Sequence, residues 1–133
     1  MIVLDTHAWV WWVAGSGRLP APSGDAIQES LDAGDPVRVS AISTWEVAML
    51  VARGRLELTM DVDDWIAHAE AAPEIEFVPV DNRIALRSVH LEGFEHRDPA
   101  DRLIVATALG MNAALVTADA RLRAYAPLAT LWD

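Results

Sequence analysis

The sequence begins with Met1-Ile2-Val3-Leu4-Asp5-Thr6, a short apolar run that is rich in β-branched residues and ends at polar ones. This pattern is typical of a buried parallel strand that ends at its first polar residue. Thr6 is a helix-capping residue type, and Gly15-Ser16-Gly17 ends the apolar segment that follows, so a short helix is predicted over residues 7–14. The chain is therefore expected to open as a strand followed by a helix.

The same alternation continues along the rest of the chain. Apolar segments bounded by turn residues predict further strands at residues 37–40, 76–80 and 113–117, with an edge strand at 128–131. Helical start and stop signals predict helices at residues 24–33, 43–54, 63–72, 81–88, 98–110 and 119–125. This order predicts an α/β fold with a mostly parallel sheet, helices on both faces, and a ligand site beyond the carboxyl ends of the strands.

Length and composition limit the classes of protein that remain. With 133 residues, 53% of them hydrophobic and 23% charged, the chain is expected to form a single domain over residues 1–133. The longest apolar run, residues 8–14, is much shorter than the roughly 20 residues of a membrane-spanning helix, and the N-terminus lacks the basic residues of a secretory signal. We therefore expect a cytoplasmic protein that does not cross a membrane. The lack of cysteine excludes disulfides, a thiolate zinc site and a cysteine nucleophile.

The chain is strongly acidic, with twenty Asp and Glu against ten Lys and Arg and a net charge of −10. This balance disfavours generic nucleic-acid binding, which depends on Lys and Arg contacts to phosphates. One explanation of the acidity is solubility alone. The other is that some carboxylates converge on a divalent cation, through which an acidic protein can bind phosphate groups.

Five acidic residues lie where predicted strands end or predicted helices begin: Asp5, Glu46, Asp98, Asp101 and Asp119. Each also has a purely structural explanation. Asp5, Asp98 and Asp119 are suited to cap helices, Ser43-x-x-Glu46 has capping-box spacing, and Asp101 lies in a first helical turn, where a carboxylate favours the helix dipole. Their positions alone therefore leave both the structural and the metal-binding interpretation open.

Local ion pairs are a second structural explanation. Arg102 and Arg123 lie four residues after Asp98 and Asp119, which is the spacing of helical neighbours. The residue at this spacing is apolar for three other carboxylates: Asp5, Glu46 and Asp101. Like charges about 4 Å apart repel by about 4 kcal/mol at an effective dielectric constant near 20, so a cluster of them requires distant arginines, raised pKa values or a metal ion. Mg²⁺ or Mn²⁺ best suits such oxygen ligands.

Four segments, taken in order, resemble the PIN-domain proteins of the VapC toxin type: Leu4-Asp5-Thr6-His7-Ala8, Ser43-Thr44-Trp45-Glu46-Val47-Ala48, Arg97-Asp98-Pro99-Ala100-Asp101-Arg102-Leu103-Ile104-Val105-Ala106-Thr107-Ala108 and Leu115-Val116-Thr117-Ala118-Asp119. The resemblance covers essentially the whole chain. It implies a three-layer α/β/α fold around a sheet of four to five strands. It also implies an endoribonuclease dependent on Mg²⁺ or Mn²⁺, inhibited by a small antitoxin protein and assembled as a homodimer or a toxin–antitoxin hetero-oligomer.

Matched motif by motif, the resemblance places four residues at the acidic active-site positions of the family, where they would bind the metal: Asp5, Glu46, Asp101 and Asp119. Asp98 is interpreted as a supporting residue or a helix cap. Thr6 and Thr117 adjoin the acidic positions and are expected to orient a carboxylate or a water molecule. One position departs from the family, because Leu50 stands where related sequences often carry a lysine.

Basic and aromatic residues near these motifs have two interpretations each. Arg97, Arg102 and Arg121 are expected either to guide the RNA backbone or to form ordinary surface ion pairs. His7 is interpreted as structural, and no partner is visible in the sequence for the other histidines: His68, His90 and His96. Of the three clustered tryptophans, Trp9 and Trp12 share a helical face while Trp11 points elsewhere, which predicts that at least one ring is exposed to a partner.

Other functions remain open at this point. A PIN-like fold whose carboxylates only cap helices would be a non-catalytic interaction module. A structure-specific DNA nuclease of related fold is a second alternative, although 133 residues leave little room for substrate-clamping segments. A haloacid-dehalogenase-like phosphatase is disfavoured, because it needs an aspartate where the chain has His7. No motif specifies which RNA would be cleaved.

Overall fold

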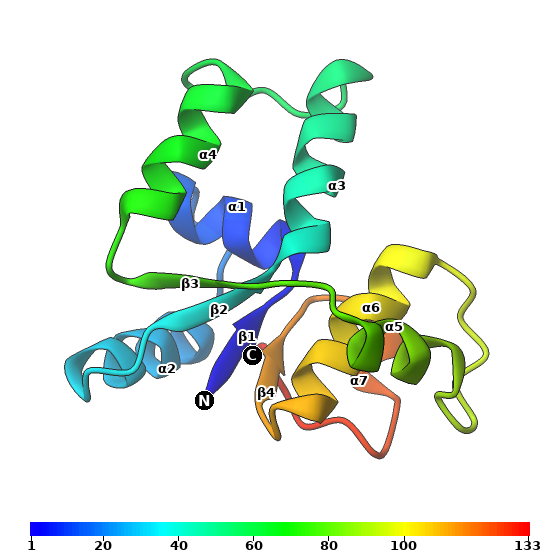
Figure 1. Ribbon diagram of the computed structural model, residues 1–133. Helices are drawn as coiled ribbons and strands as arrows, with labels where there is room; N and C mark the ends of the chain where they lie inside the picture. The colour runs from blue at the N-terminus through cyan, green and yellow to red at the C-terminus, as the bar shows by residue number, and fades with distance from the viewer.

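The computed structural model describes residues 1–133 and contains one five-stranded sheet (Figure 1). The spatial order is β3-β2-β1-β4-β5, and every neighbouring pair is parallel. The strand bounds are β1 Ile2–Leu4, β2 Val37–Ser40, β3 Ile75–Val78, β4 Ala114–Val116 and β5 Thr130–Leu131. The α/β class and the parallel sheet of four to five strands are therefore confirmed, and the carboxyl ends of all five strands lie at one edge.

Strand β1 lies at the centre of this sheet because it is apolar on both faces. Leu4 pairs with Val39 of β2 on one side and with Val116 of β4 on the other, and all three side chains are fully buried. A short, continuous apolar run is what a strand covered on both faces requires. Strand β1 thus connects two segments, around Val39 and Val116, that are far apart in the sequence.

Helices form a layer on each face of the sheet. One core contains Leu4 and is covered by α1 Thr6–Ala14, α2 Ala21–Asp32, α3 Ala41–Ala52 and α4 Val62–Ala71. The other core contains Val3 and is covered by α6 Pro99–Gly110 and α7 Ala120–Arg123, with α5 Asn82–Val89 packed against α6. Successive residues of a strand point to opposite faces, so Val3 and Leu4 separate the two cores. This is the three-layer arrangement expected from the sequence.

Trp9 is the largest side chain that is fully buried. Its ring lies 4.7 Å from that of Trp65 and 5.6 Å from that of Phe77, measured between ring centroids. Its Nε1 has no hydrogen-bond partner. Trp11 and Trp12 are both partly buried and pack against the same core, so none of the three residues is fully exposed, and exposure of a ring to a partner stays a prediction.

The predicted capping box is wrong. Helix α3 begins at Ala41 because the Ser40 side chain accepts a hydrogen bond from the Ile42 N–H at 3.2 Å, and Ser40 is therefore the N-cap. Ser43 and Glu46 consequently lie inside the helix, and their side chains are free for other contacts.

None of the helices has both the length and the apolar character needed to cross a membrane.

Candidate active site

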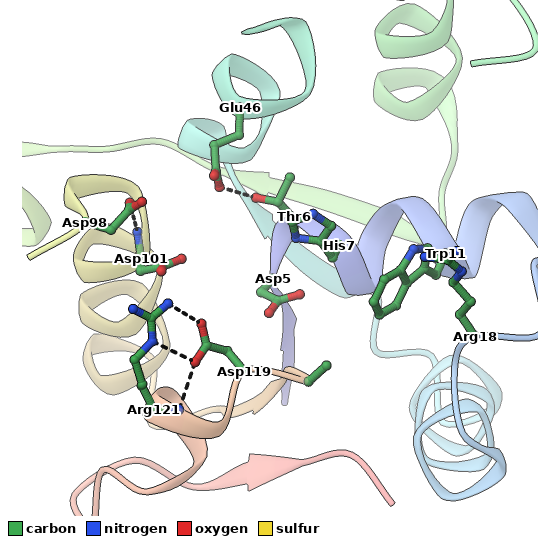
Figure 2. Close-up of a pocket in the computed structure, with 11 residues that line it drawn as sticks. Asp5, Thr6, His7, Trp11, Arg18, Glu46, Asp98, Asp101, Asp119 and Arg121 are labelled. Atoms are coloured by element: carbon green, nitrogen blue, oxygen red, sulfur yellow. Dashed lines mark hydrogen bonds and ion pairs between the residues drawn. The ribbon is translucent and has the colours of Figure 1, made fainter. Parts of the chain in front are cut away.

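An open pocket with a volume of about 510 Å³ lies at the carboxyl edge of the sheet (Figure 2). The structure brings together there all four predicted acidic residues and Asp98, which are contributed by segments far apart in the sequence: Asp5, Glu46, Asp98, Asp101 and Asp119. Thr6 and Arg121, which were also predicted, line the same pocket. The convergence expected from the parallel topology is thus observed.

Helix capping places three of these carboxylates. Asp5 follows β1 and caps α1, because its Oδ1 accepts a hydrogen bond from the Ala8 N–H at 2.9 Å. Asp98 caps α6 by accepting from the Asp101 N–H at 3.1 Å, and Asp119 caps α7 by accepting from the Arg121 N–H at 2.8 Å. The capping interpretation is therefore correct, but it does not compete with a functional one, since the same side chains line the pocket.

Glu46 reaches the pocket from α3 and is held by Thr6. The Thr6 hydroxyl donates to Glu46 Oε1 at 2.5 Å and shares a second hydrogen bond with Ser43 Oγ at 2.9 Å. Thr117 is fully buried behind the pocket, where its hydroxyl accepts from the Asp119 N–H at 3.1 Å and also acts to lower the pKa of Asp5. Both threonines thus orient acidic side chains, in keeping with the expectation for them.

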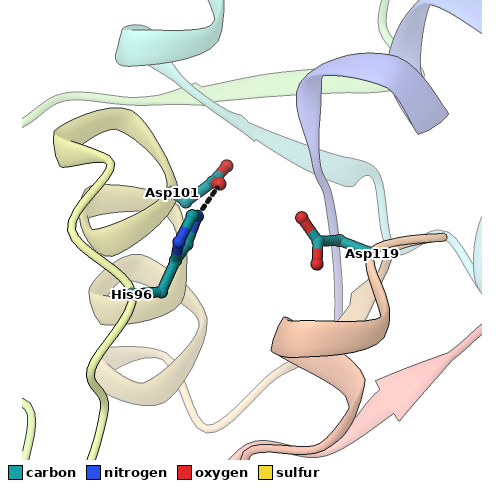
Figure 3. A group of neighbouring side chains, drawn as sticks. All are labelled: His96, Asp101 and Asp119. Atoms are coloured by element: carbon teal, nitrogen blue, oxygen red, sulfur yellow. Dashed lines mark hydrogen bonds and ion pairs between the residues drawn. The ribbon is translucent and has the colours of Figure 1, made fainter.

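His96 is a member of the site that the sequence analysis missed (Figure 3). Its Nε2 lies 2.6 Å from Asp101 Oδ2, so His96 has a partner that the sequence did not reveal. One ligand atom from each of His96, Asp101 and Asp119 lies within 4.8 Å of the other two. The position of His96 two residues before the helix cap Asp98 is the signal that could have indicated it, because the chain entering a helix passes close to the first turn.

The structure separates the three arginines predicted to contact RNA. Arg121 lines the pocket and lies 3.2 Å from Asp119 Oδ2, whereas Arg97 is exposed outside it. Arg102 does not line the pocket. Its guanidinium donates to the carbonyl groups of Ser88 at 2.7 Å and Phe94 at 2.9 Å, which fixes the loop before α6.

The predicted helical ion pairs of Asp98 with Arg102 and of Asp119 with Arg123 are wrong. Arg102 is occupied by backbone carbonyls, and Arg123 instead lies 2.8 Å from Asp133. His7 also differs from its structural interpretation, because its side chain is exposed and lines the pocket.

Burial and mutual repulsion dominate the electrostatics of the pocket. Burial raises the pKa of Asp5, Glu46 and Asp101, and neighbouring carboxylates add to the rise. Burial also tends to raise the pKa of Asp119, but hydrogen bonds and the charge of Arg121 outweigh burial, so the pKa of Asp119 is lowered. The site therefore gathers three carboxylates whose charged forms are disfavoured without a nearby cation, beside Asp119, whose charge is offset by Arg121.

The donor set suits a hard divalent cation. All the carboxylates offer oxygen ligands, which Mg²⁺ and Mn²⁺ prefer. Glu46 and Asp101 each use one carboxylate oxygen in a hydrogen bond to Thr6 or His96, while the other oxygen has no protein partner. A bound cation would use these free oxygens and relieve the repulsion between the carboxylates.

We expect Glu46→Gln to stabilise the metal-free protein at pH 7. Because the pKa of native Glu46 is raised above its ordinary value of 4.5, the native state binds more protons than the unfolded state between those two values. The contribution of Glu46 to the free energy of unfolding therefore falls as the pH rises through this window. Glutamine removes this effect and retains the oxygen that accepts from Thr6.

Urea unfolding in EDTA over a series of pH values measures this difference. The advantage of Glu46→Gln over the wild type is expected to grow as the pH rises from 4.5. Glu57→Gln, at an exposed position outside the pocket, is the matched control and should show no such trend. A Glu46→Gln protein that is no more stable than the wild type at pH 7 would contradict the raised pKa of Glu46.

Comparison with known proteins gives a consistent result. The family model described as PIN domain matches residues 2–128. The chain is 36% identical over 124 residues to Ribonuclease VapC22 of Mycobacterium tuberculosis (strain ATCC 25618 / H37Rv). The aligned region covers 93% of this chain and 91% of that protein. Both the family and a full-length relative are therefore identified by sequence.

Solved structures share the fold at lower sequence identity. VapBC2 from Rickettsia felis, bound to a DNA fragment from their promoter, has a TM-score of 0.72 at 16% identity over 100% of both chains. FitAcB from Neisseria gonorrhoeae has a TM-score of 0.65 at 21% identity, over 98% of this chain and 96% of that one. A toxin–antitoxin complex from Klebsiella pneumoniae has a TM-score of 0.63 at 20% identity, over 98% and 97%.

Proposed function

Because the chain belongs to the PIN domain family, we propose that it is an endoribonuclease that hydrolyses RNA phosphodiester bonds with the help of Mg²⁺ or Mn²⁺. The observation that carries the proposal is the convergence of four carboxylates from distant segments in one open pocket. The 36% identical relative, a ribonuclease by name, supports the same activity. An acidic pocket cannot attract a phosphate by itself, so the proposed cation accounts for both the carboxylates and the substrate.

Four residues are proposed to hold the cation: Asp5, Glu46, Asp101 and Asp119. When bound, the ion would lower the pKa of a water molecule and offset charge on the phosphate. The protein supplies the positions of the ligands. Thr6 fixes the Glu46 carboxylate and His96 fixes that of Asp101, while Asp98 holds the first turn of α6 from which Asp101 projects.

Loss of the His96 side chain should weaken divalent-cation binding. Removing a hydrogen-bond partner of a metal ligand typically costs 10- to 100-fold in affinity, so we expect His96→Ala to raise the dissociation constant for Mn²⁺ by about 10- to 100-fold. His96→Gln, which can still donate to Asp101, should recover part of this loss. Calorimetric titration with Mn²⁺ measures the change, and His90→Ala, outside the pocket, is the control. Unchanged Mn²⁺ affinity in His96→Ala would contradict the role of His96.

We further propose that the protein is the toxin of a toxin–antitoxin pair, assembled with a small antitoxin as a homodimer or hetero-oligomer. The solved complex from Klebsiella pneumoniae, which shares the fold, supports this proposal. Leu86 and Val89 of α5 are 62% and 70% exposed and, three residues apart on one helix, they lie on the same face, which offers an apolar contact to a partner. A surface with a net charge of −10 also suits a partner that carries basic residues.

Incubation of the purified protein with total cellular RNA tests the proposed activity. Discrete products are expected with Mg²⁺ or Mn²⁺, and none with EDTA. Thermal unfolding with and without Mn²⁺ provides a second readout that does not depend on the choice of RNA. If folded protein neither cleaves RNA nor gains thermal stability from Mn²⁺, the metal-dependent nuclease is wrong and a non-catalytic interaction module takes its place.

A further inference from the structure

The pocket has a second wall whose chemistry differs from that of the acidic side. Trp11 and Arg18 line the pocket opposite Asp101 and Asp119, with Asp5 lying between the two sides (Figure 2). The Arg18 Cζ atom lies 5.6 Å from the centroid of the Trp11 ring. An aromatic ring and a guanidinium group thus face the same space as the carboxylates.

This wall continues into a second cavity with a volume of about 190 Å³. Four residues line both cavities: Thr6, His7, Trp11 and Arg18. The second cavity adds Arg55, and the apolar Leu50 and Leu56 lie beside it. The acidic pocket therefore opens along Trp11 into a neighbouring space whose charged side chains are basic.

The arginines of this surface have no acidic partner. Arg18 and Arg55 are exposed, and neither side chain forms an ion pair or a hydrogen bond, in contrast to Arg38 and Arg121, which pair with acidic residues. The chain contains no lysine, so all ten of its basic residues are arginines, which can stack on aromatic rings as well as bind phosphate. Two unpaired arginines in a protein with a net charge of −10 remain available for an anionic ligand.

Trp11 is held in place but keeps part of its surface accessible. Its ring lies 5.8 Å from that of Trp132 and 5.7 Å from that of His7, and the residue is only partly buried. Trp9, on the same helix, is fully buried, whereas Trp11 packs against the core with only part of its surface. Trp11 therefore offers a stable aromatic surface beside the site at which the phosphodiester would be cleaved.

We propose that Trp11, Arg18 and Arg55 form a subsite for the nucleotide next to the cleaved phosphodiester, with the base stacked on Trp11 and the adjoining phosphate paired with the arginines. Single-stranded nucleic acids are bound by this combination of aromatic stacking and positive charge. The inference rests on the proposed ribonuclease function, since it names a part of the substrate for the same pocket.

Binding of two fluorescein-labelled ten-nucleotide probes tests the subsite, with Ca²⁺ in place of Mg²⁺ so that the proposed nuclease does not cleave the probes during the measurement. One probe is oligoadenylate, and the other is an abasic ribose-phosphate chain of the same length and charge. Trp11→Leu should weaken oligoadenylate binding about tenfold and leave binding of the abasic probe unchanged. Trp11→Phe keeps an aromatic ring and should retain most of the affinity. Trp45→Ala, at an exposed tryptophan outside the pocket, is the control.

The arginines have a separate signature. Arg18→Gln should reduce the slope of log affinity against log salt by about 0.7 for both probes, because one phosphate contact is lost. Arg83→Gln, at an exposed position on α5 outside the pocket, should leave the slope unchanged. If Arg18→Gln leaves the slope unchanged, the proposed phosphate contact is overturned.

Cleavage of total RNA by the same proteins separates this proposal from the proposed function. If the wild type cleaves RNA while Trp11→Leu binds both probes as the wild type does, the subsite is overturned and the ribonuclease stands. An equal loss of affinity for both probes would also overturn base stacking. If the wild type does not cleave RNA but the probes show the expected dependence on Trp11 and Arg18, the subsite stands and hydrolysis is wrong.

Discussion

Asp5→Asn is expected to reduce RNA cleavage by about 10³-fold while leaving the protein folded. Removing one group that stabilises charge at a reacting centre typically lowers the rate by about 10²- to 10³-fold. We expect the upper end of this range because Asp5 is the most deeply buried of the proposed ligands. Asparagine keeps the oxygen that accepts from the Ala8 N–H, so the cap of α1 is retained. Single-turnover cleavage of a labelled RNA at saturating Mn²⁺ measures the effect.

The matched control is Asp25→Asn, an exposed aspartate on α2 that does not line the pocket. It should cleave RNA at the wild-type rate. Thermal unfolding without divalent cations should show that Asp5→Asn is at least as stable as the wild type, because burial disfavours the charged carboxylate. Cleavage by Asp5→Asn within tenfold of the wild-type rate would place the chemistry outside this pocket.

Trp9→Ala is expected to have the largest effect on stability. Truncation of a buried Phe or Trp typically costs about 3–5 kcal/mol, against a total of about 5–15 kcal/mol for a domain of this kind. Trp9 is fully buried and contacts both Trp65 of α4 and Phe77 of β3, so its loss leaves a cavity between two helices and the sheet. Urea unfolding followed by far-ultraviolet circular dichroism measures the free energy of unfolding.

Two further variants make the Trp9 result specific. Trp45→Ala removes a side chain that is 57% exposed and should cost far less. Trp9→Phe should lie between the wild type and Trp9→Ala, because it keeps an aromatic ring and removes an N–H that has no hydrogen-bond partner. If Trp9→Ala and Trp45→Ala lose the same stability, Trp9 is not the centre of this core.

The sheet and the acidic site were predictable because both depend on local patterns. An apolar run followed by a capping residue indicates a strand that leads into a helix, and this pattern marks both Asp5 and Asp119. Once the strands are parallel, residues that follow them must meet at one edge. The two aspartates therefore share a pocket as a consequence of topology.

Contacts that depend on tertiary geometry could not be predicted in the same way. Helical spacing suggested that Arg102 pairs with Asp98, but carbonyl groups of α5 and of the loop before α6 occupy its guanidinium. The capping box at Ser43 failed because Ser40, at the end of β2, offered an earlier cap. His96 escaped notice because its partner, Asp101, is defined by the path of that same loop. The partners of Arg102 and His96 thus depend on the path of a loop that no local pattern specifies, whereas Ser40 is a local cap within the predicted strand at residues 37–40.

The central position of β1 has a consequence for the order in which the protein is made. Strand β1 is synthesised before both of its neighbours, and one of them, β4, spans Ala114–Val116, with Asp119 following it. A nascent chain that has not yet reached these residues lacks half of the hydrogen bonding of its central strand and one wall of the acidic pocket. The pocket can therefore be completed only after Asp119 has been translated, so a chain that ends before this residue is expected to be inactive.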